Sequence, residues 1–393
     1  MTTPKVEQTP SSDKPSRLRR AGKGLLWVLG AGLVLFAVTL VGTTSMLETF
    51  GASAQGARLD RIKRSPQYKD GQFTNVIPTT PGLKEGRGWS TMTRFLFGDE
   101  KRIPDGQLPM ATGTVERWKT APVSGLRVTW LGHSTMLLEI DGVTVLADPV
   151  WGQRASPSSV VGPKRYHQPP VSLSQLPSLD AVVISHDHYD HLDMPTIKAL
   201  AQTTDVHFYV PLAVGAHLEF WGVPTERIHE MDWYEEAQVG ALKVVSTPCR
   251  HFSGRKGFDR NSTLWTSWAF VGPQHRVYFG GDSGMTPQFE EIGERFGPFD
   301  LTMLEVGAYN ENWGDIHLGP HQALKAHKML QGKVLLPIHW GTFVLAPHAW
   351  DSPPETLIDQ APSAGVKLAM PILAQPIEPS VETPLEPWWR SVR

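Results

Sequence analysis

The sequence predicts an α/β (α+β) fold in which two packed sheets are flanked by helices. Strand-like apolar runs alternate with helix-like segments from residue 125 onward, which is typical of a layered domain. The chain lacks the Gly-rich fingerprint of dinucleotide-binding folds, which argues against a Rossmann arrangement. With 393 residues, it can form one large domain or two medium ones with a sizeable core.

The first strands are the most clearly marked elements. Alternating apolar residues begin at 126–131, and the runs 136–140 and 143–147 flank Asp141-Gly142. An Asp-Gly pair between two such runs predicts a hairpin. Further strands are expected near 206–210, 242–246, 265–271, 275–280, 301–305 and 333–338, and helices near 194–202, 211–219, 286–295 and 319–330.

The ends of the chain differ in composition from the predicted hydrolase domain at 125–375. Residues 1–23 are Pro/Ser/Thr-rich and basic and are expected to be disordered. Residues 43–124 contain many Gly and Pro residues and are expected to form a linker and an extended arm that packs on the domain. Residues 376–393 are expected to form a Pro-rich C-terminal tail. The anchors expected for the arm are Phe73, Trp89, Phe95, Leu96 and Phe97.

Residues 24–42 form a stretch of 19 residues without a charge. As a helix, it would span about 28 Å at ~1.5 Å per residue, close to the ~30 Å hydrocarbon layer. Six cations precede it, which predicts a cytoplasmic N-terminus and a catalytic domain across the membrane. A cleaved signal peptide is the alternative, because Ala52-Ser53-Ala54 resembles a cleavage site. The length of the apolar run favours an uncleaved transmembrane helix.

Charge and cysteine content exclude some classes of function. The net charge is −2, so no basic field favours a nucleic-acid partner. Cys249 is the single cysteine, which excludes an intrachain disulfide and a cysteine-based zinc site.

The strongest candidate site is the segment 185–191, Ser-His-Asp-His-Tyr-Asp-His. It follows the apolar run 181–184 and precedes a helix start at Met194, for which Asp193 is the expected N-cap. Such a strand-to-helix loop can direct several side chains at one point.

Four side chains of this loop are expected to bind metal. Residues two apart in an extended segment point the same way, so His186 and His188 can bind one ion. Asp190 and His191, further along the loop, can reach a second ion. Imidazole and carboxylate ligands suit zinc, with manganese and iron as alternatives.

Three later residues complete a pattern that resembles a known superfamily. His251, Asp282 and His339 each follow or end a strand-like run, so each is expected at one edge of a sheet. Together with the HxHxDH motif, this order resembles the metallo-β-lactamase superfamily. Within it, the chain resembles the family of N-acyl-phosphatidylethanolamine-hydrolysing phospholipases D and its bacterial branch. The supporting phrases are Thr-Trp-Leu-Gly-His-Ser-Thr at 129–135, Ala-Asp-Pro-Val at 147–150, Pro-Ile-His-Trp-Gly-Thr-Phe at 337–343, and the segment 64–75.

The resemblance implies an αββα sandwich that holds two Zn²⁺ ions per chain. One metal would take His186, His188 and His251. The other would take Asp190, His191 and His339, and Asp282 would bridge the pair. A water between two such cations has a lowered pKa, and the resulting hydroxide is the expected nucleophile.

The resemblance also suggests residues that act beside the metals. Asp190 is the candidate to orient or deprotonate the water. His317 lies where these phospholipases have an active-site histidine, and it could donate a proton to the phosphate or the leaving group. His133 and Asp148 are expected to fix the ligand imidazoles from behind.

The function implied is that of a membrane-anchored dinuclear zinc phosphodiesterase that releases phosphatidic acid from N-acyl-phosphatidylethanolamine. Its expected partners are a phospholipid or other small phosphodiester substrate and the membrane. The expected location is the bacterial inner membrane, with a single span and a periplasmic catalytic domain. Two alternatives remain open: the same fold as a lactonase, similar to the ascorbate-6-phosphate lactonase group, and a non-catalytic membrane-tethered scaffold. The phrase Gly281-Asp282-Ser283-Gly284 matches a serine-protease turn, but it lacks the histidine motif that a serine nucleophile needs.

Overall fold

The computed structural model describes residues 1–2, 4–5, 46–79, 82, 84 and 86–393. The chain divides into two compact units, Met1–Glu48 and Thr49–Arg393, and the elements described below belong to the second unit. Apart from its first residues, the tail expected at 1–23 lies outside the described residues, as does the anchor expected at 24–42. Among the helices that the structure describes, none combines the length and the apolar composition needed to cross a membrane.

The first large sheet has seven strands within the described part of the chain. In sheet order they are β15 (Pro376–Ile377), β3 (Leu126–Trp130), β4 (Met136–Ile140), β5 (Val143–Ala147), β6 (Ala181–Val183), β7 (His207–Pro211) and β8 (Ile228–Met231). The predicted hairpin is confirmed, since β4 and β5 pair antiparallel. Its turn residues Asp141 and Gly142 have φ of 48° and 84°, and two positive φ values define a type I′ turn, for which Asp-Gly is suited.

The second large sheet has six strands among the described residues. In sheet order they are β14 (Gly332–Ile338), β13 (Phe299–Glu305), β12 (Arg276–Phe279), β11 (Ser267–Val271), β10 (Leu242–Thr247) and β9 (Glu236–Val239). β12, β13 and β14 are parallel to one another, whereas β9 to β12 pair antiparallel. Both sheets are therefore mixed.

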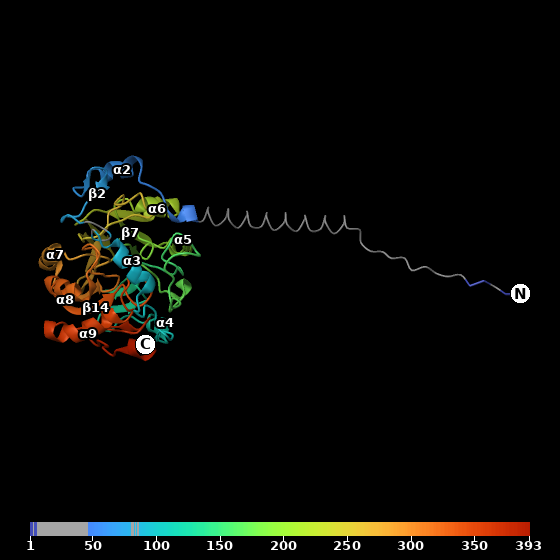
Figure 1. The fold of residues 1–393 in the computed structure, drawn as a ribbon. Helices are drawn as coiled ribbons and strands as arrows, with labels where there is room; N and C mark the ends of the chain where they lie inside the picture. The colour runs from blue at the N-terminus through green and yellow to red at the C-terminus, as the bar shows by residue number, and fades with distance from the viewer. Residues whose placement is uncertain (3, 6–45, 80–81, 83, 85) are drawn as a thin grey trace. The chain divides into compact units, whose positions relative to one another are not determined.

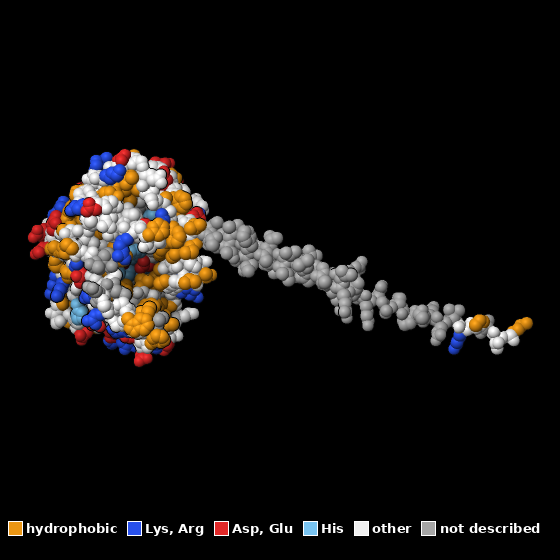
Figure 2. Space-filling model, turned by 45° about the horizontal axis from the view of Figure 1, so that its top comes forward, with side chains coloured by type: hydrophobic (Ala, Val, Ile, Leu, Met, Phe, Trp, Pro, Cys, Tyr) orange, Lys and Arg blue, Asp and Glu red, His pale blue; other side chains and the backbone are white. Residues whose placement is uncertain are grey.

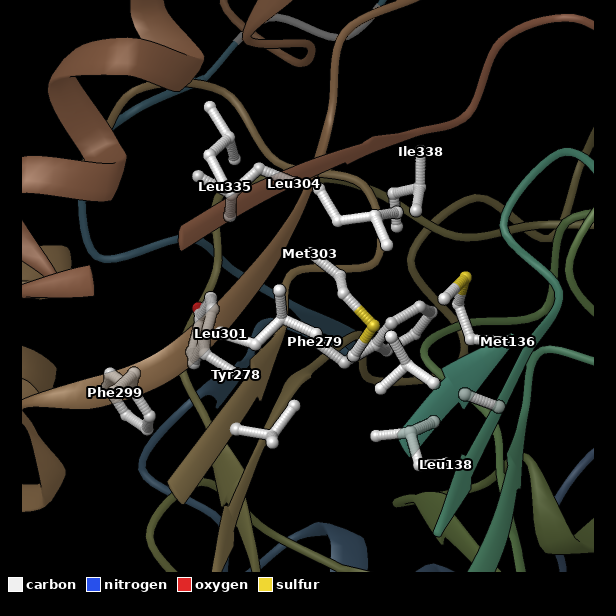
Figure 3. Close-up of a cluster of buried hydrophobic side chains, with 14 of the residues drawn as sticks. Met136, Leu138, Tyr278, Phe279, Phe299, Leu301, Met303, Leu304, Leu335 and Ile338 are labelled. Atoms are coloured by element: carbon white, nitrogen blue, oxygen red, sulfur yellow. The ribbon is translucent and has the colours of Figure 1, made fainter. Parts of the chain in front are cut away.

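The two sheets pack face to face and bury one continuous core. Figure 3 shows Met136 and Leu138 of β4 facing Phe279 and Met303 of the second sheet. The helices are α2 (Gly56–Ile62), α3 (Gly88–Phe97), α4 (Thr114–Arg117), α5 (Met194–Thr203), α6 (Gly215–Phe220), α7 (Gln288–Phe296), α8 (Gly319–Met329) and α9 (Ser352–Ala364). α5 and α6 pack on the outer face of the first sheet, and α7, α8 and α9 pack on the second. The expected αββα layering is confirmed (Figure 1).

The elements that the sequence pattern missed are short or contain proline. β8 and β9 have four residues each and lie at sheet edges, so they carry little alternation. α9 contains Pro353, Pro354 and Pro362. The first two occupy the first turn, where proline leaves no hydrogen bond unmade, so proline marks the start of this helix rather than an interruption.

The arm at 43–124 is less extended than expected, because it contains α2, α3, α4 and the two-stranded pair β1 (Tyr68–Lys69) and β2 (Gln72–Phe73). Its expected anchor Phe73 is fully buried, so that prediction is confirmed. The prediction is wrong for Trp89, Phe95 and Phe97, which are exposed. The Leu96 side chain is not among those described.

Residues 376–393, expected as a Pro-rich tail, contribute to the core. β15 pairs with β3, and Trp388 and Trp389 are buried. Trp388 stacks on Trp340, with ring centroids 5.4 Å apart, and Trp340 stacks on Trp130 of β3. The aromatic rings attach this segment to the strands that lead to the candidate site.

We expect His327 of α8 to make stability depend on pH. Burial lowers the pKa of this imidazole to about 4, while an unfolded histidine titrates near ~6.5. As pH falls through this window, the unfolded state takes up a proton that the folded state refuses, so stability decreases. His327→Gln removes this titrating group. Denaturant unfolding should show that the free energy of unfolding of the wild type falls by about 1–2 kcal/mol more than that of the variant between pH 7 and pH 4.5. Parallel stability curves would contradict the assignment.

Candidate metal centre

The loop after β6 brings the predicted motif to one edge of the first sheet. It ends where α5 begins, and Asp193 caps that helix by accepting a hydrogen bond from the Thr196 N–H, as predicted. The Arg255 guanidinium holds the loop from behind, donating to the backbone carbonyls of Asp187 and Leu192. Arg255 is almost fully buried, so the loop is fixed by the fold.

The first group of expected ligands comprises three histidines. His186 Nε2 lies 2.8 Å from His188 Nδ1, and His251 Nε2 lies 3.3 Å from the same nitrogen. His251 follows β10, which belongs to the second sheet. His186 and His251, which are 65 positions apart in the chain, thus come together with His188. One nitrogen of each imidazole points to a common centre.

The second group comprises Asp190, His191 and His339. Asp190 Oδ2 lies 3.5 Å from His191 Nε2 and 3.3 Å from His339 Nε2. His133 joins this group, with its Nε2 3.0 Å from the same carboxylate oxygen. His133 therefore contacts Asp190 directly, a role that fits the supporting position expected for it.

Asp282 lies between the two groups. Its Oδ1 is 3.3 Å from His191 Nε2 and its Oδ2 is 3.2 Å from His339 Nε2. Oδ2 also lies 3.9 Å from His186 and 3.8 Å from His251. The carboxylate thus faces members of both groups, as a bridging ligand would.

Local backbone geometry determines how several of these side chains point. His133, Asp148 and His339 have φ of 52°, 40° and 63°, a region that non-glycine residues rarely occupy. Each lies just beyond a strand end. Such conformations persist where the surrounding structure enforces them, and they concentrate at functional sites.

Gly281 is required next to Asp282. Its φ is 55°, and a Cβ at this position would lie 2.5 Å from the Ser185 Cβ. A side chain at 281 would therefore separate the two sheets where the site forms. The glycine permits the second sheet to approach the 185–191 loop.

The donor set fits divalent cations. The buried atoms His191 Nε2 and Asp282 Oδ1 face each other at 3.3 Å, but neither makes a hydrogen bond in the described structure. Such buried polar atoms are rare unless an ion or water meets them. Five imidazoles and two carboxylates in two adjoining groups suit zinc, manganese or iron. The seven residues predicted as ligands are brought together.

The electrostatics of the cluster favour cations at its centre. Burial by itself would raise the pKa of Asp282, but His191 and His339 outweigh it and hold that pKa well below its usual range. Burial opposes protonation of His339, yet Asp282 and Asp190 raise its pKa to about 10. The carboxylates thus create a negative potential at the point where the imidazoles converge.

Asp148 contacts the cluster through His191. Its Oδ2 accepts a hydrogen bond from His191 Nδ1 at 2.7 Å, which leaves His191 Nε2 as the free nitrogen. The same carboxylate accepts bonds from the Ser185 N–H and hydroxyl. A carboxylate behind a histidine fixes its tautomer and ring orientation toward a metal.

We expect Asp148→Asn to lower metal affinity by ~10–100-fold, the usual effect of removing such a partner. Competition with a chromophoric chelator measures this affinity. Asp141→Asn is the control, because Asp141 lies at the other end of the same hairpin, where it binds His275. Equal metal affinity in wild type and Asp148→Asn would contradict this role.

His317 lies beside the cluster and is held by a residue that sequence reasoning missed. Glu305, the last residue of β13, is fully buried, and its Oε2 lies 2.5 Å from His317 Nδ1. Its Oε1 accepts from the Ser283 and Leu318 N–H groups. The signal in the sequence that could have identified Glu305 is an acidic residue at the end of an apolar, strand-like run.

Because Glu305 binds His317 Nδ1, the Nε2 atom of His317 points away from the Glu305 carboxylate. Burial opposes protonation of His317, but Glu305 outweighs it and raises the pKa. His317 Nδ1 lies 3.8 Å from Asp282 Oδ2, and its ring centroid is 5.3 Å from that of His251. His317 therefore lies beside the seven-residue cluster, whereas His321 lies on the surface of α8.

The Ser283 hydroxyl does not form a serine nucleophile. It accepts a hydrogen bond from the Arg250 N–H and donates to the Gly284 carbonyl. Both partners are backbone groups, and no histidine contact is found for it among the described residues. The resemblance to a protease turn is therefore a coincidence of sequence.

The comparisons with known proteins agree with this geometry. Residues 143–340 match the pattern described as "Beta-lactamase superfamily domain". The chain belongs to the metallo-β-lactamase superfamily. A protein of Mycobacterium tuberculosis described as uncharacterized is 49% identical over 359 residues, covering 89% of this chain and 93% of that protein.

One further relative indicates the type of chemistry, and one solved structure shows the same fold. The N-acyl-phosphatidylethanolamine-hydrolyzing phospholipase D 1 of Caenorhabditis elegans is 38% identical over 256 residues, covering 62% of this chain and 71% of that protein. The structure of a metallo hydrolase from Ignicoccus hospitalis shares the fold, with a TM-score of 0.51 at 23% identity over 64% of this chain and 97% of that one. This member of the metallo-β-lactamase superfamily is a metal-dependent hydrolase.

Proposed function

We propose that this hydrolase is a membrane-anchored dinuclear zinc phosphodiesterase of phospholipase D type, acting on N-acyl-phosphatidylethanolamine. The observation that carries the proposal is the Glu305-held His317 beside the seven-residue cluster, in a chain similar to a phospholipase of that name. A phosphodiester needs an acid or hydrogen-bond donor for its departing oxygen, and His317 supplies one at the edge of the cluster.

The roles of the residues follow from their positions. His186, His188 and His251 would hold one cation, Asp190, His191 and His339 the other, and Asp282 would contact both. When bound, the cations would activate water and polarise the phosphoryl oxygen. Asp190 accepts a hydrogen bond from His133, which fixes its carboxylate so that it can orient the attacking water.

The reaction breaks the bond between phosphorus and the ethanolamine oxygen. Water adds its oxygen to phosphorus, which yields phosphatidic acid, and the departing oxygen takes up a proton to yield an N-acylethanolamine. His317 is the residue proposed to deliver that proton. Its Glu305 partner keeps the imidazole oriented and favours the protonated form.

The membrane part of the proposal rests on the sequence. The uncharged residues 24–42 have the length of a membrane span, and the cations before them favour a cytoplasmic N-terminus. We propose a single-pass anchor in a bacterial inner membrane, with the hydrolase domain on the periplasmic side. A C-terminal alkaline phosphatase fusion tests this topology, since it should be active; a fusion active only as a cytoplasmic reporter would reverse it.

The substrate proposal is tested with the full chain in mild detergent, loaded with zinc. Lipid mass spectrometry should show phosphatidic acid and N-acylethanolamine in equal amounts, and elemental analysis should give two metal ions per chain. A lactone is tested in parallel as a second substrate, and its hydrolysis distinguishes a lactonase from a phosphodiesterase. No phosphatidic acid alongside rapid lactone opening would favour the lactonase function, and no metal in active protein would exclude the dinuclear mechanism.

A further inference from the structure

The helix α3 presents its apolar side to solvent. Trp89, Met92, Phe95 and Phe97 are 73%, 47%, 38% and 79% exposed, whereas Thr91 on the same helix is only 7% exposed. Amphipathic helices of soluble domains normally show the opposite arrangement, with apolar residues inward. Trp89 is also the one exposed tryptophan among the described residues, and ten others are buried.

This surface adjoins the candidate site. The Lys84 N–H donates to the Asn312 carbonyl, and the Gly314 N–H donates to the Gly82 carbonyl, so the segment before α3 is bonded to the loop that leads to His317. Lys84 also lines a pocket of about 290 Å³ that contains His317. At the other end of α3, Arg102 donates to the Phe95 carbonyl.

Arg102 also lines the pocket that contains His339. Lys84 and Arg102 thus line two pockets that contain site histidines, and α3 lies between these two residues in the sequence. On the face shown in Figure 2, hydrophobic side chains gather in patches separated by Lys and Arg side chains. An exposed apolar surface of this kind is typical of an interaction surface.

Charges around α3 suit a phospholipid interface. Arg87 is exposed at the start of the helix and Arg94 is partly exposed on it. Arg94 shares its charge with Glu100, and Lys84 donates to the Glu311 carbonyl. Tryptophan and phenylalanine flanked by cations are favoured where hydrocarbon meets headgroups.

The length of the chain keeps the domain near a bilayer. Arg255 Nε donates to the Thr49 carbonyl and the Thr49 hydroxyl donates to the Pro157 carbonyl, so Thr49 is part of the domain. Six residues, 43–48, lie between it and Gly42, the end of the proposed anchor, which makes seven chain steps. Fully extended, they reach at most about 25 Å.

We propose that the exposed apolar side of α3, formed by Trp89, Met92, Phe95 and Phe97, docks into the surface of a phospholipid bilayer. Docking brings the entrance of the site to headgroup depth, so a lipid can reach the metals without leaving the membrane fully. This inference rests on the proposed function. A bilayer is the favoured occupant because the substrate and the anchor both lie in one.

The test uses single cysteines in the full chain, reconstituted in vesicles of phosphatidylcholine and phosphatidylglycerol. Cys249 is buried, so a cysteine introduced by Phe97→Cys can be labelled selectively with an environment-sensitive dye. Val381→Cys is the control, since Val381 is 70% exposed beyond β15, at the end of the sheet away from the site. Lipids with brominated acyl chains should quench the dye at 97 and leave the dye at 381 unquenched.

Two results would overturn the docking proposal. One is equal quenching, or none, at both positions. The other is a dye at 97 that is shielded from aqueous iodide without quenching by brominated lipid, which would identify a second copy or another protein as the occupant. Quenching does not require turnover. Loss of hydrolysis with quenching intact would therefore count against the proposed function alone.

A second measurement uses activity. Trp89→Ser with Phe97→Ser should lower kcat/KM toward substrate in vesicles, relative to a monodisperse short-chain substrate, by at least about tenfold. The exchange Trp89→Phe with Phe97→Trp keeps the apolar area and should restore the ratio. Val123→Ser with Val381→Ser, also exposed, should not change it. An unchanged ratio in the first variant would contradict the docking role.

Discussion

Asp282→Ala is expected to remove bound metal and to lower hydrolysis by at least about 100-fold. Even the outer partners of metal ligands typically account for ~10–100-fold, and Asp282 contacts both groups of ligands directly. Elemental analysis of the purified variant should give fewer than two ions per chain. Steady-state turnover of a phosphodiester measures the loss of activity.

The physical reason is the central position of this carboxylate. Asp282 lies within 3.9 Å of His186, His191, His251 and His339, and it is almost fully buried. Removing it leaves Asp190 as the one carboxylate among the seven cluster residues, so the buried imidazoles face less negative charge and a cation among them is less stable.

Asp205→Ala is the matched control, because the Asp205 side chain is fully exposed and lies 3.9 Å from Arg227. It should retain two ions and full activity. Circular dichroism of Asp282→Ala separates loss of metal from loss of fold. A folded Asp282→Ala variant with full metal content and full activity would refute the assigned centre.

Trp389→Ala is expected to destabilise the domain by ~3–5 kcal/mol, the usual cost of removing a buried tryptophan. Trp389 is fully buried. It meets Trp340 and Trp388 edge-on, with ring centroids 5.8 Å and 5.6 Å away, and its Nε1–H donates to Glu355 Oε1 at 2.9 Å. The substitution would leave a cavity and remove one hydrogen bond to Glu355 Oε1, which still accepts from Arg390 and Arg393.

Urea unfolding followed by circular dichroism measures this change in stability. Trp89→Ala is the matched control, because the same side chain is removed from an exposed position and should change stability by less than about 0.5 kcal/mol. Equal effects of the two substitutions would show that residues 376–393 do not form part of the folded core.

Local pattern was sufficient for much of this protein. Alternation and the Asp141-Gly142 turn predicted the β4–β5 hairpin, and the apolar run with its capping Asp193 predicted β6, the loop and α5. The order of His186, His188, Asp190, His191, His251, Asp282 and His339 indicated which residues would meet. The hairpin and loop signals each lie within a few residues, because a side chain's direction on a strand or helix depends on its immediate neighbours. The grouping of the distant ligands came from the resemblance to the superfamily.

Long-range packing decided the rest. The Glu305–His317 pair joins a strand end to a later loop, Trp389 enters the core 259 residues after Trp130, and the positive φ values of His133, Asp148 and His339 are enforced by the surrounding sheets. Trp89 and Phe97 were expected to pack on the domain, but an apolar residue type does not report what covers it, and the structure leaves both side chains exposed. By itself, the sequence determined which side chains were expected to meet at the candidate site and the strand ends that present them. The tertiary structure decided which residues hold those side chains in place and which apolar face stays uncovered, because both depend on contacts between segments far apart in the chain.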